Sequence, residues 1–253
     1  FLYMEQNKME LRLAQWNSGK MHNAIPRDGK VIFAVPADRK EEVMADWNVF
    51  TAGVEDEFHV TDPTMHWGME SVERQQVMPQ QISRGLILSL QALDNGPLTT
   101  CQDEALAYMV ETSSNVASVQ SEANKVVIVA SQRSNVMSNL TNMANTVKAV
   151  FELSGAKVVQ NDGYPAWKMN PNSNLVKITV DAYKKLFKKE PTVKGIHAGL
   201  ECGLFSEKYP ELDMVSFGPT LRNVHTPDEC LYIPTVQMVW DHLLEILKNI
   251  PQE

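Results

Sequence analysis

Two segments near the end of the chain combine a histidine with carboxylates in loops marked by glycine or proline. Residues 195–203, GIHAGLECG, contain His197 and Glu201, and residues 216–229, SFGPTLRNVHTPDE, contain His225. Each loop follows a short apolar run, and metallohydrolases present their ligands in such loops at strand ends. The two segments therefore predict a metal site or a substrate site of a hydrolase.

His225 is the strongest candidate metal ligand. Pro227 restrains its loop, and the carboxylates Asp228 and Glu229 follow directly. Either carboxylate can accept the ring N–H of His225, which fixes the tautomer and leaves the other ring nitrogen for a metal ion. A single loop histidine is more often an ordinary polar residue, so the residues alone leave that alternative open.

His197 and Glu201 lie four residues apart among three glycines. If a helix begins near Leu200, its first backbone N–H groups favour an anionic or carbonyl group of a substrate. Glu201 then suits a substrate amine or imidazole. The alternative is that the glycines serve only a tight turn. We interpret the adjacent Cys202 as a small buried residue rather than as a reactive thiol.

Together the two segments resemble the closing part of the aminoacyl-histidine (Xaa-His) dipeptidases. These enzymes belong to the two-zinc peptidase superfamily, with the carnosinases, peptidase T and succinyl-diaminopimelate desuccinylase. The resemblance runs along the chain and implies the C-terminal half of such an enzyme. It implies that His225 is the last protein ligand of a two-zinc centre, that His197 and Glu201 contact a dipeptide, and that zinc-activated water hydrolyses the Xaa-His bond.

Five further residues are candidates for binding the substrate. Asn23 in the sequence NAIPR resembles the Asn-x-Ile-Pro element through which lid domains of the superfamily approach the substrate. Arg27 and Arg133 can each hold a peptide carboxylate through two parallel hydrogen bonds. Ser113 and Asn115 occupy the equivalent place in a second copy of the lid unit. The alternative for each arginine is an exposed side chain that binds nothing specific.

An internal repeat in residues 1–160 is expected to position these five substrate-binding candidates. Each copy reads as strand, strand, helix, strand, and the opening helix of the first copy is expected to end near Phe1. The predicted elements are strands at 9–16, 30–35 and 57–61 with a helix at 38–50 capped by Asp38 and Glu41, then a helix at 84–93, strands at 105–110, 125–130 and 156–160, and a helix at 134–153. Two such α+β units, each a sheet covered on one face by helices, predict a duplicated lid domain.

Residues 161–253 read as part of an α/β layer. Helices are predicted at 174–189, 200–208 and 234–249, with short strands before His197 and at 213–217. Alternating strands and helices predict a mainly parallel sheet, and so few strands need further strands to form a stable one. The predicted fold is therefore a duplicated α+β lid followed by the C-terminal part of an α/β zinc-peptidase catalytic domain.

Composition excludes several classes of function. The formal net charge of −8 and the isoelectric point near 5.3 argue against a nucleic-acid or anionic-membrane surface. No apolar run approaches the roughly 20 residues that span a bilayer. The three cysteines are scattered and form no disulfide framework, which favours a reducing, cytoplasmic location.

Several groups that the resemblance requires are absent from the 253 residues. There is no His-x-Asp sequence, and the only adjacent glutamates, Glu41 and Glu42, begin a predicted lid helix. The general base and most ligands of the two zinc ions are expected upstream of Phe1, so the chain alone is expected to be inactive. Its partners are then the missing N-terminal half and a dipeptide.

The sequence leaves open whether the enzyme is a homodimer and whether another divalent metal replaces zinc. An aminoacylase, a desuccinylase or a broader dipeptidase on the same scaffold is the nearest alternative function. A non-catalytic module that uses the repeated lid for association is the alternative from a different class.

Overall fold

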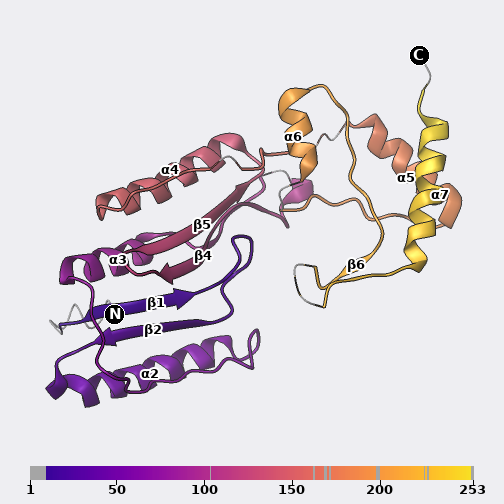
Figure 1. Cartoon of the computed structure of the whole chain (residues 1–253). Coiled ribbons are helices and arrows are strands. Elements are labelled where there is room, and N and C mark those ends of the chain that lie inside the picture. The colour runs from indigo at the N-terminus through magenta and orange to yellow at the C-terminus, as the bar shows by residue number, and fades with distance from the viewer. Residues whose placement is uncertain are drawn as a thin grey trace. The chain divides into compact units, whose positions relative to one another are not determined.

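The chain divides into two compact units, each of which is described by itself. The first unit comprises Phe1–Gly96, Ser114–Gln132 and Asn142–Gln160, and the second Pro97–Ser113, Arg133–Thr141 and Asn161–Glu253. Figure 1 shows the protein as a computed structural model, which describes residues 10–102, 104–161, 163–167, 170, 172–197, 200–224, 226 and 228–251. None of the helices in these ranges is long and apolar enough to cross a membrane.

A β-hairpin begins the described part of the first unit. Strand β1 (Arg12–Ser18) pairs antiparallel with β2 (Gly29–Ala34), and a bulge between Leu13 and Gln15 shifts the register. Leu13 is completely buried, whereas Gln15 is exposed although it lies two positions on, because the bulge interrupts the regular alternation of side chains. The hairpin therefore has one apolar face that two helices can cover.

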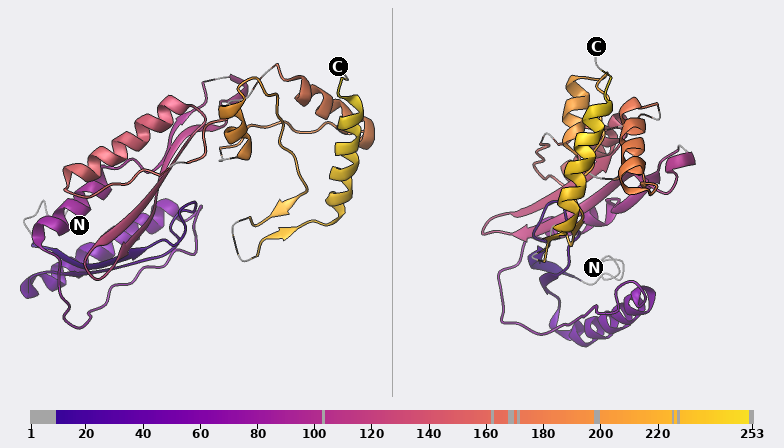
Figure 2. Two further views of the ribbon diagram at one scale, coloured as in Figure 1. Left: turned by 45° about the horizontal axis from the view of Figure 1, so that its top comes forward. Right: turned by 90° about the vertical axis from the view of Figure 1, so that its right-hand side faces the viewer.

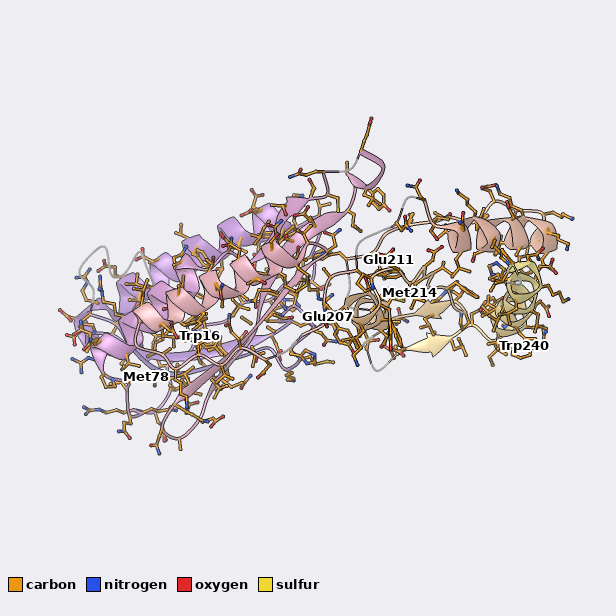
Figure 3. The ribbon with its side chains drawn as sticks, turned by 90° about the horizontal axis from the view of Figure 1, so that it is seen from above. Trp16, Met78, Glu207, Glu211, Met214 and Trp240 are labelled. Atoms are coloured by element: carbon orange, nitrogen blue, oxygen red, sulfur yellow. The ribbon has the colours of Figure 1, made fainter. Side chains whose placement is uncertain are left out.

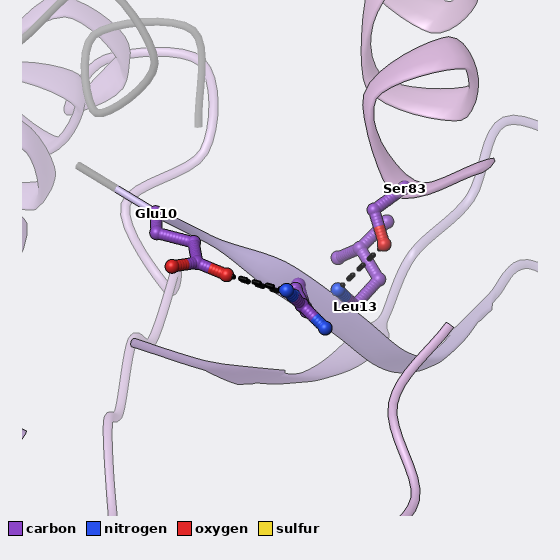
Figure 4. Close-up of polar contacts among 4 residues, drawn as sticks. Glu10, Leu13 and Ser83 are labelled. Atoms are coloured by element: carbon purple, nitrogen blue, oxygen red, sulfur yellow. Dashed lines mark hydrogen bonds and ion pairs between the residues drawn. The ribbon is translucent and has the colours of Figure 1, made fainter. Parts of the chain in front are cut away.

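Helices α2 (Lys40–Phe58) and α3 (Gln80–Ala92) contribute to the apolar core beside β1. Val43 of α2 and Leu86 of α3 are buried in one cluster with Leu13. The hydroxyl of Ser83, also fully buried, accepts a hydrogen bond from the Leu13 amide at 3.0 Å (Figure 4). This bond pairs a backbone N–H that the bulge would otherwise leave unsatisfied.

The sheet continues through three further strands. These are β3 (Gly96–Thr100), β4 (Val110–Ser121) and β5 (Val126–Ser134), in the order β2-β1-β4-β3 with β5 also paired to β4. Helix α4 (Met137–Leu153) follows β5. Both halves of residues 1–160 thus contain two strands followed by a helix, as the predicted repeat requires, although the first strand of the second copy is β4 and not the expected strand at 105–110.

Three helices and a short hairpin lie in residues 161–253. Helices α5 (Asn174–Phe187) and α7 (Pro234–Asn249) pack against each other, and α6 (Glu201–Lys208) lies between them in the sequence. Strands β6 (Leu221–Arg222) and β7 (Cys230–Leu231) form an antiparallel hairpin that leads into α7 (Figure 2). The three helices confirm the sequence pattern, whereas the hairpin was not predicted.

Several predicted strands are wrong. Helix α2 continues to Phe58 and replaces the strand at 57–61, because the Asp62 amide donates to the Phe58 carbonyl and continues the helical pattern. Residues Glu104–Leu106 form a 3-10 turn, so the strand at 105–110 is not formed and β4 begins only at Val110. Local β propensity is a weak preference that such contacts override.

Other predicted features also differ from the structure. Residues 156–160, 191–196 and 213–217, all of them described, form no strand, because a strand requires a neighbour with which to pair. The capping box of Asp38 and Glu41 is wrong, since Asp38 lies in a 3-10 turn and α2 has no side-chain cap. The expected helix end at Phe1 lies outside the described residues.

Candidate functional site

A hydrogen bond joins His197 to Ser113 in the second unit. The imidazole Nε2 lies 2.6 Å from the hydroxyl oxygen of Ser113, which comes from β4, 84 positions earlier in the chain. Both side chains are partly buried. Folding therefore brings together two residues that the sequence suggested separately as substrate contacts.

The loop that carries His197 is fixed by the segment before β4. The Gly195 amide donates a hydrogen bond of 3.1 Å to the hydroxyl of Tyr108. A Cβ atom at Gly195 would lie 3.0 Å from the Met109 sulfur and 3.4 Å from a methyl group of Leu106. Glycine thus permits the close approach that positions His197. The sequence analysis missed Tyr108, because no local pattern reports a contact 87 residues away.

The surroundings of His197 disfavour its protonated form. Burial of the imidazole and the positive charge of Arg133 lower the pKa of His197, and a hydrogen bond with the Val110 backbone only partly offsets them. The tautomer of the ring decides whether Nε2 or the Ser113 hydroxyl donates in their hydrogen bond. Nε2 becomes available to a ligand only when Ser113 releases it.

Arg133, near the end of β5, places a positive charge beside the same loop. Its Nη1 donates a long hydrogen bond of 3.5 Å to the His197 carbonyl. The next residue, Ser134, bonds Thr112 of β4 through their hydroxyls at 2.9 Å. Within the described residues, the His197 carbonyl takes one of the guanidinium's five donors, and the others can serve another acceptor.

Glu201 is the first residue of α6 and is exposed. Gly203 in the same turn packs against Pro165, since a Cβ atom there would collide with the Pro165 carbonyl oxygen. The thiol of Cys202 has a raised pKa, chiefly because it is partly buried and secondarily because Glu201 is near. A thiol that holds its proton is a poor nucleophile, which supports the structural interpretation of Cys202.

The lid candidate Asn115 bonds the backbone beside Asn23, the other lid candidate, in the first unit. The Asn115 side-chain amide donates a hydrogen bond of 2.9 Å to the carbonyl of Ala24. The side-chain oxygen of Asn23 is buried and has no hydrogen-bond partner among the described residues. Arg27 is exposed. An unpaired buried acceptor beside a bonded amide is an arrangement that a ligand's N–H group can complete.

His225 and Pro227 lie outside the described residues. The residues around them form the loop of the β6–β7 hairpin, in which Asn223 adopts a left-handed conformation (φ 53°). The Thr226 hydroxyl donates to the Asn223 carbonyl at 2.7 Å and accepts from the Asp228 amide at 3.2 Å. The Glu229 amide donates to the Thr226 carbonyl at 3.1 Å. Thr226 therefore links, through these three hydrogen bonds, Asn223 with the predicted carboxylate partners Asp228 and Glu229.

The described part of the chain contains no cluster of three or more histidine, cysteine, aspartate or glutamate side chains that could hold a metal ion. His242 is buried, and its Nε2 lies 2.8 Å from the Thr179 carbonyl, among Tyr183 and Phe217. Its role is therefore in the packing of α7 on α5.

Comparison with known proteins identifies the family. Residues 29–249 match the family described as Peptidase family M20/M25/M40. The chain belongs to this peptidase family. Its mixed α/β fold matches the crystal structure of the aminoacylhistidine dipeptidase from Vibrio alginolyticus, with a TM-score of 0.83 and 33% identity over 100% of this chain and 52% of that chain.

The chain is also similar in sequence to the cytosol non-specific dipeptidase of Escherichia coli (strain K12). It is 34% identical over 252 residues, which are 99% of this chain and 52% of the relative. This M20/M25/M40 chain thus spans about half the length of the relatives it matches. The similarity extends through both units, so the site residues in each unit lie within the matched region.

Proposed function

We propose that this chain forms part of a zinc dipeptidase that hydrolyses dipeptides, with Xaa-His dipeptides as preferred substrates. The observation that carries the proposal is similarity to two dipeptidases along 99% and 100% of the chain. Residues 1–160 would form the lid and residues 161–253 the C-terminal portion of the catalytic domain. The acidic charge and scattered cysteines favour a cytoplasmic enzyme.

We propose that His225 provides one ligand to a two-zinc centre and that Asp228 or Glu229 orients its ring. Dipeptidases of this family are generally metal-dependent. Zinc held there would supply the activation of a water molecule that attacks the peptide carbonyl. The remaining ligands and the general base would come from sequence outside these 253 residues, because the chain has no His-x-Asp and its only Glu-Glu lies in the first turn of α2. The isolated chain is therefore expected to be inactive.

The residues of the second unit suit one end of a dipeptide. Arg133 supplies a positive charge for a carboxylate, whereas burial and that same charge lower the pKa of the nearby His197 and so disfavour a second cation there. A carboxylate or carbonyl group that bonds Ser113 in place of His197 would release Nε2 toward the substrate. Glu201, exposed at the start of α6, would accept an amine or imidazole N–H of the substrate.

The residues of the first unit suit hydrogen bonding to substrate amides. The free side-chain oxygen of Asn23 can accept one N–H, and Asn115 holds the backbone next to it. The exposed Arg27 would contact a carboxylate only if the substrate reaches its loop. Whether these contacts come from one protomer or from a homodimer depends on the assembled enzyme.

The proposal is tested in a protein of the full length of its relatives that contains these 253 residues. His225→Ala should reduce bound zinc, measured by elemental analysis, and lower turnover of an Xaa-His dipeptide at least about 100-fold, since even residues that only orient ligands cost 10- to 100-fold. The matched control is His66→Ala, which removes an exposed histidine. Full activity with both zinc ions retained in His225→Ala would refute the ligand assignment.

A broader dipeptidase is the second candidate, because the Escherichia coli relative is named as non-specific. Comparison of kcat/KM for Xaa-His dipeptides with that for dipeptides lacking histidine decides between the two. Hydrolysis of acylated or succinylated amino acids in place of dipeptides would indicate an aminoacylase or a desuccinylase. No hydrolysis and no bound metal in the full-length protein would favour an association module.

A further inference from the structure

A tight turn before β4 supports the loop of residues 195–197. Glu104–Leu106 forms a 3-10 turn, and the Met109 amide then donates to the Leu106 carbonyl at 2.8 Å. Leu106 and Met109 are buried in one small apolar cluster. A Cβ atom at Gly195 would lie 3.0 Å from the Met109 sulfur, so the buried side of the turn packs directly against the Gly195 backbone.

Tyr108, in the same turn, adds a polar contact to this loop. Its hydroxyl accepts a hydrogen bond of 3.1 Å from the Gly195 amide, although the residue is 60% exposed. The core of the turn is formed by Leu106 and Met109, so the stability of the turn does not depend on the Tyr108 hydroxyl. A residue this exposed loses little burial when its hydroxyl is removed. The hydroxyl therefore serves the loop rather than the core.

Three side chains hold the loop through hydrogen bonds. Tyr108 bonds the Gly195 amide. The Ser113 hydroxyl lies 2.6 Å from Nε2 of His197, and Arg133 donates to the His197 carbonyl at 3.5 Å. Ser113 and Arg133 are themselves candidates for binding the substrate, so a bound dipeptide competes with the loop for their polar atoms. The Tyr108 contact uses no substrate-binding candidate, and it therefore persists when the other two are drawn to the substrate.

We propose that Tyr108 is a positioning residue of the dipeptide site: its hydroxyl fixes the Gly195 backbone and thereby places the His197 imidazole. Two residues of backbone separate the Gly195 amide from the His197 ring, so freedom of movement at the amide is passed on to the ring. A displaced imidazole weakens binding of the dipeptide and leaves the zinc chemistry unchanged, which raises KM and not kcat. This inference rests on the proposed function, because it takes His197 as a substrate contact.

Tyr108→Phe removes the hydroxyl and keeps the ring. In a protein of the full length of its relatives that contains these 253 residues, the KM for a hydrolysed dipeptide should rise about 3- to 10-fold, the factor that one neutral hydrogen bond contributes, while kcat stays within about twofold.

The matched control is Tyr209→Phe. Tyr209 is also 60% exposed and follows α6, between Glu207 and Glu211, which Figure 3 labels. The Gly195 amide bonds Tyr108 and not Tyr209, so the control should change KM by less than about twofold.

NMR of the 253-residue chain reports the position of the loop without zinc or activity. Hydrogen exchange of the Gly195 amide should speed at least about threefold in Tyr108→Phe, because the amide loses its acceptor. The ring resonances of His197 should shift in the same variant. Those of His242, which is buried with Nε2 2.8 Å from the Thr179 carbonyl, should stay in place.

Three results would overturn the proposal. The first is unchanged Gly195 exchange with unchanged His197 resonances. The second is a displaced loop that leaves KM unchanged, or an equal fall in kcat and kcat/KM, since neither describes a residue that positions a substrate contact. The third is a variant that does not fold, because the hydroxyl would then serve the core.

The NMR and kinetic measurements separate this proposal from the proposed function. If the loop moves in Tyr108→Phe but the full-length protein hydrolyses no dipeptide, the proposed function fails and the positioning of His197 by Tyr108 stands. If the full-length protein hydrolyses dipeptides while Tyr108→Phe leaves the loop and KM unchanged, the function stands and the role of Tyr108 is refuted.

Discussion

Gly19 should be essential to the loop that carries Asn23 and Arg27. It is buried after β1 with φ +69°, and its amide and carbonyl bond Asp28 and Gln120, respectively. A Cβ atom at Gly19 would lie 3.0 Å from the carbonyl carbon of Ala117 in β4 and closer still to the attached oxygen. Alanine at this position would therefore meet both a disfavoured backbone conformation and a rigid backbone neighbour.

The expected loss follows from these two effects. A left-handed conformation costs a non-glycine residue about 1–2 kcal/mol, and forcing a backbone shift by overpacking costs about 1–3 kcal/mol. Gly19→Ala should therefore lower the free energy of unfolding by about 2–5 kcal/mol. The matched control is Gly53→Ala within α2, where a Cβ atom meets nothing within 4 Å. That variant should gain about 0.5–1 kcal/mol from reduced backbone entropy of the unfolded chain.

Urea-induced unfolding of the 253-residue chain measures both variants. Intrinsic tryptophan fluorescence is suitable, since three of the five tryptophans, Trp16, Trp47 and Trp67, lie in the first unit. A Gly19→Ala variant as stable as the parent chain would refute the reasoning from the close approach. A Gly53→Ala variant that loses stability would refute the reasoning from open space and helix propensity.

Three further predictions concern the second unit. Burial opposes ionisation of Asp213, but hydrogen bonds from the Leu175 amide and other donors outweigh burial and lower the pKa of the Asp213 carboxyl. The stabilising contribution of Asp213 is therefore complete above the unfolded pKa of about 3.9 and is lost as pH falls through the lower folded pKa. Asp213→Asn should flatten the acid limb of a curve of stability against pH, and an unchanged limb would contradict this. NMR titration of the His197 ring should give a pKa below 6.5 in the parent chain. The pKa should rise in Arg133→Gln, because that substitution removes a neighbouring positive charge. A His197 pKa at or above 6.5 in the parent chain would contradict the prediction. Gly203→Ala should displace α6 from Pro165 and speed amide hydrogen exchange in α6, and unchanged exchange would show that the contact is not restrictive.

Periodicity in the sequence determined most of the helices. The pattern at 234–249 predicted α7 with the bounds that the structure shows, and the patterns at 84–93 and 174–189 predicted α3 and α5 to within a few residues at each end. Helical hydrogen bonds are local, so the residues that form them lie within one stretch of sequence. The family relationship was also readable, because the motif around His197 and the sequence around His225 are contiguous.

The strands depended on partners that local sequence does not specify. Residues 57–61 and 213–217 have similar strand-like composition to 30–35, yet only the last pairs with a neighbour. A strand forms its hydrogen bonds with another segment, so its existence depends on what the tertiary structure places beside it.

The sequence by itself determined which residue types were available for chemistry: a histidine with nearby carboxylates in each of two loops, arginines in the lid and the lack of a complete ligand set. Only the tertiary structure decided that Ser113 and Arg133 lie beside His197 and that the buried side-chain oxygen of Asn23 has no hydrogen-bond partner among the described residues. These contacts join positions up to 84 residues apart, and chain folding, rather than sequence spacing, sets their distances.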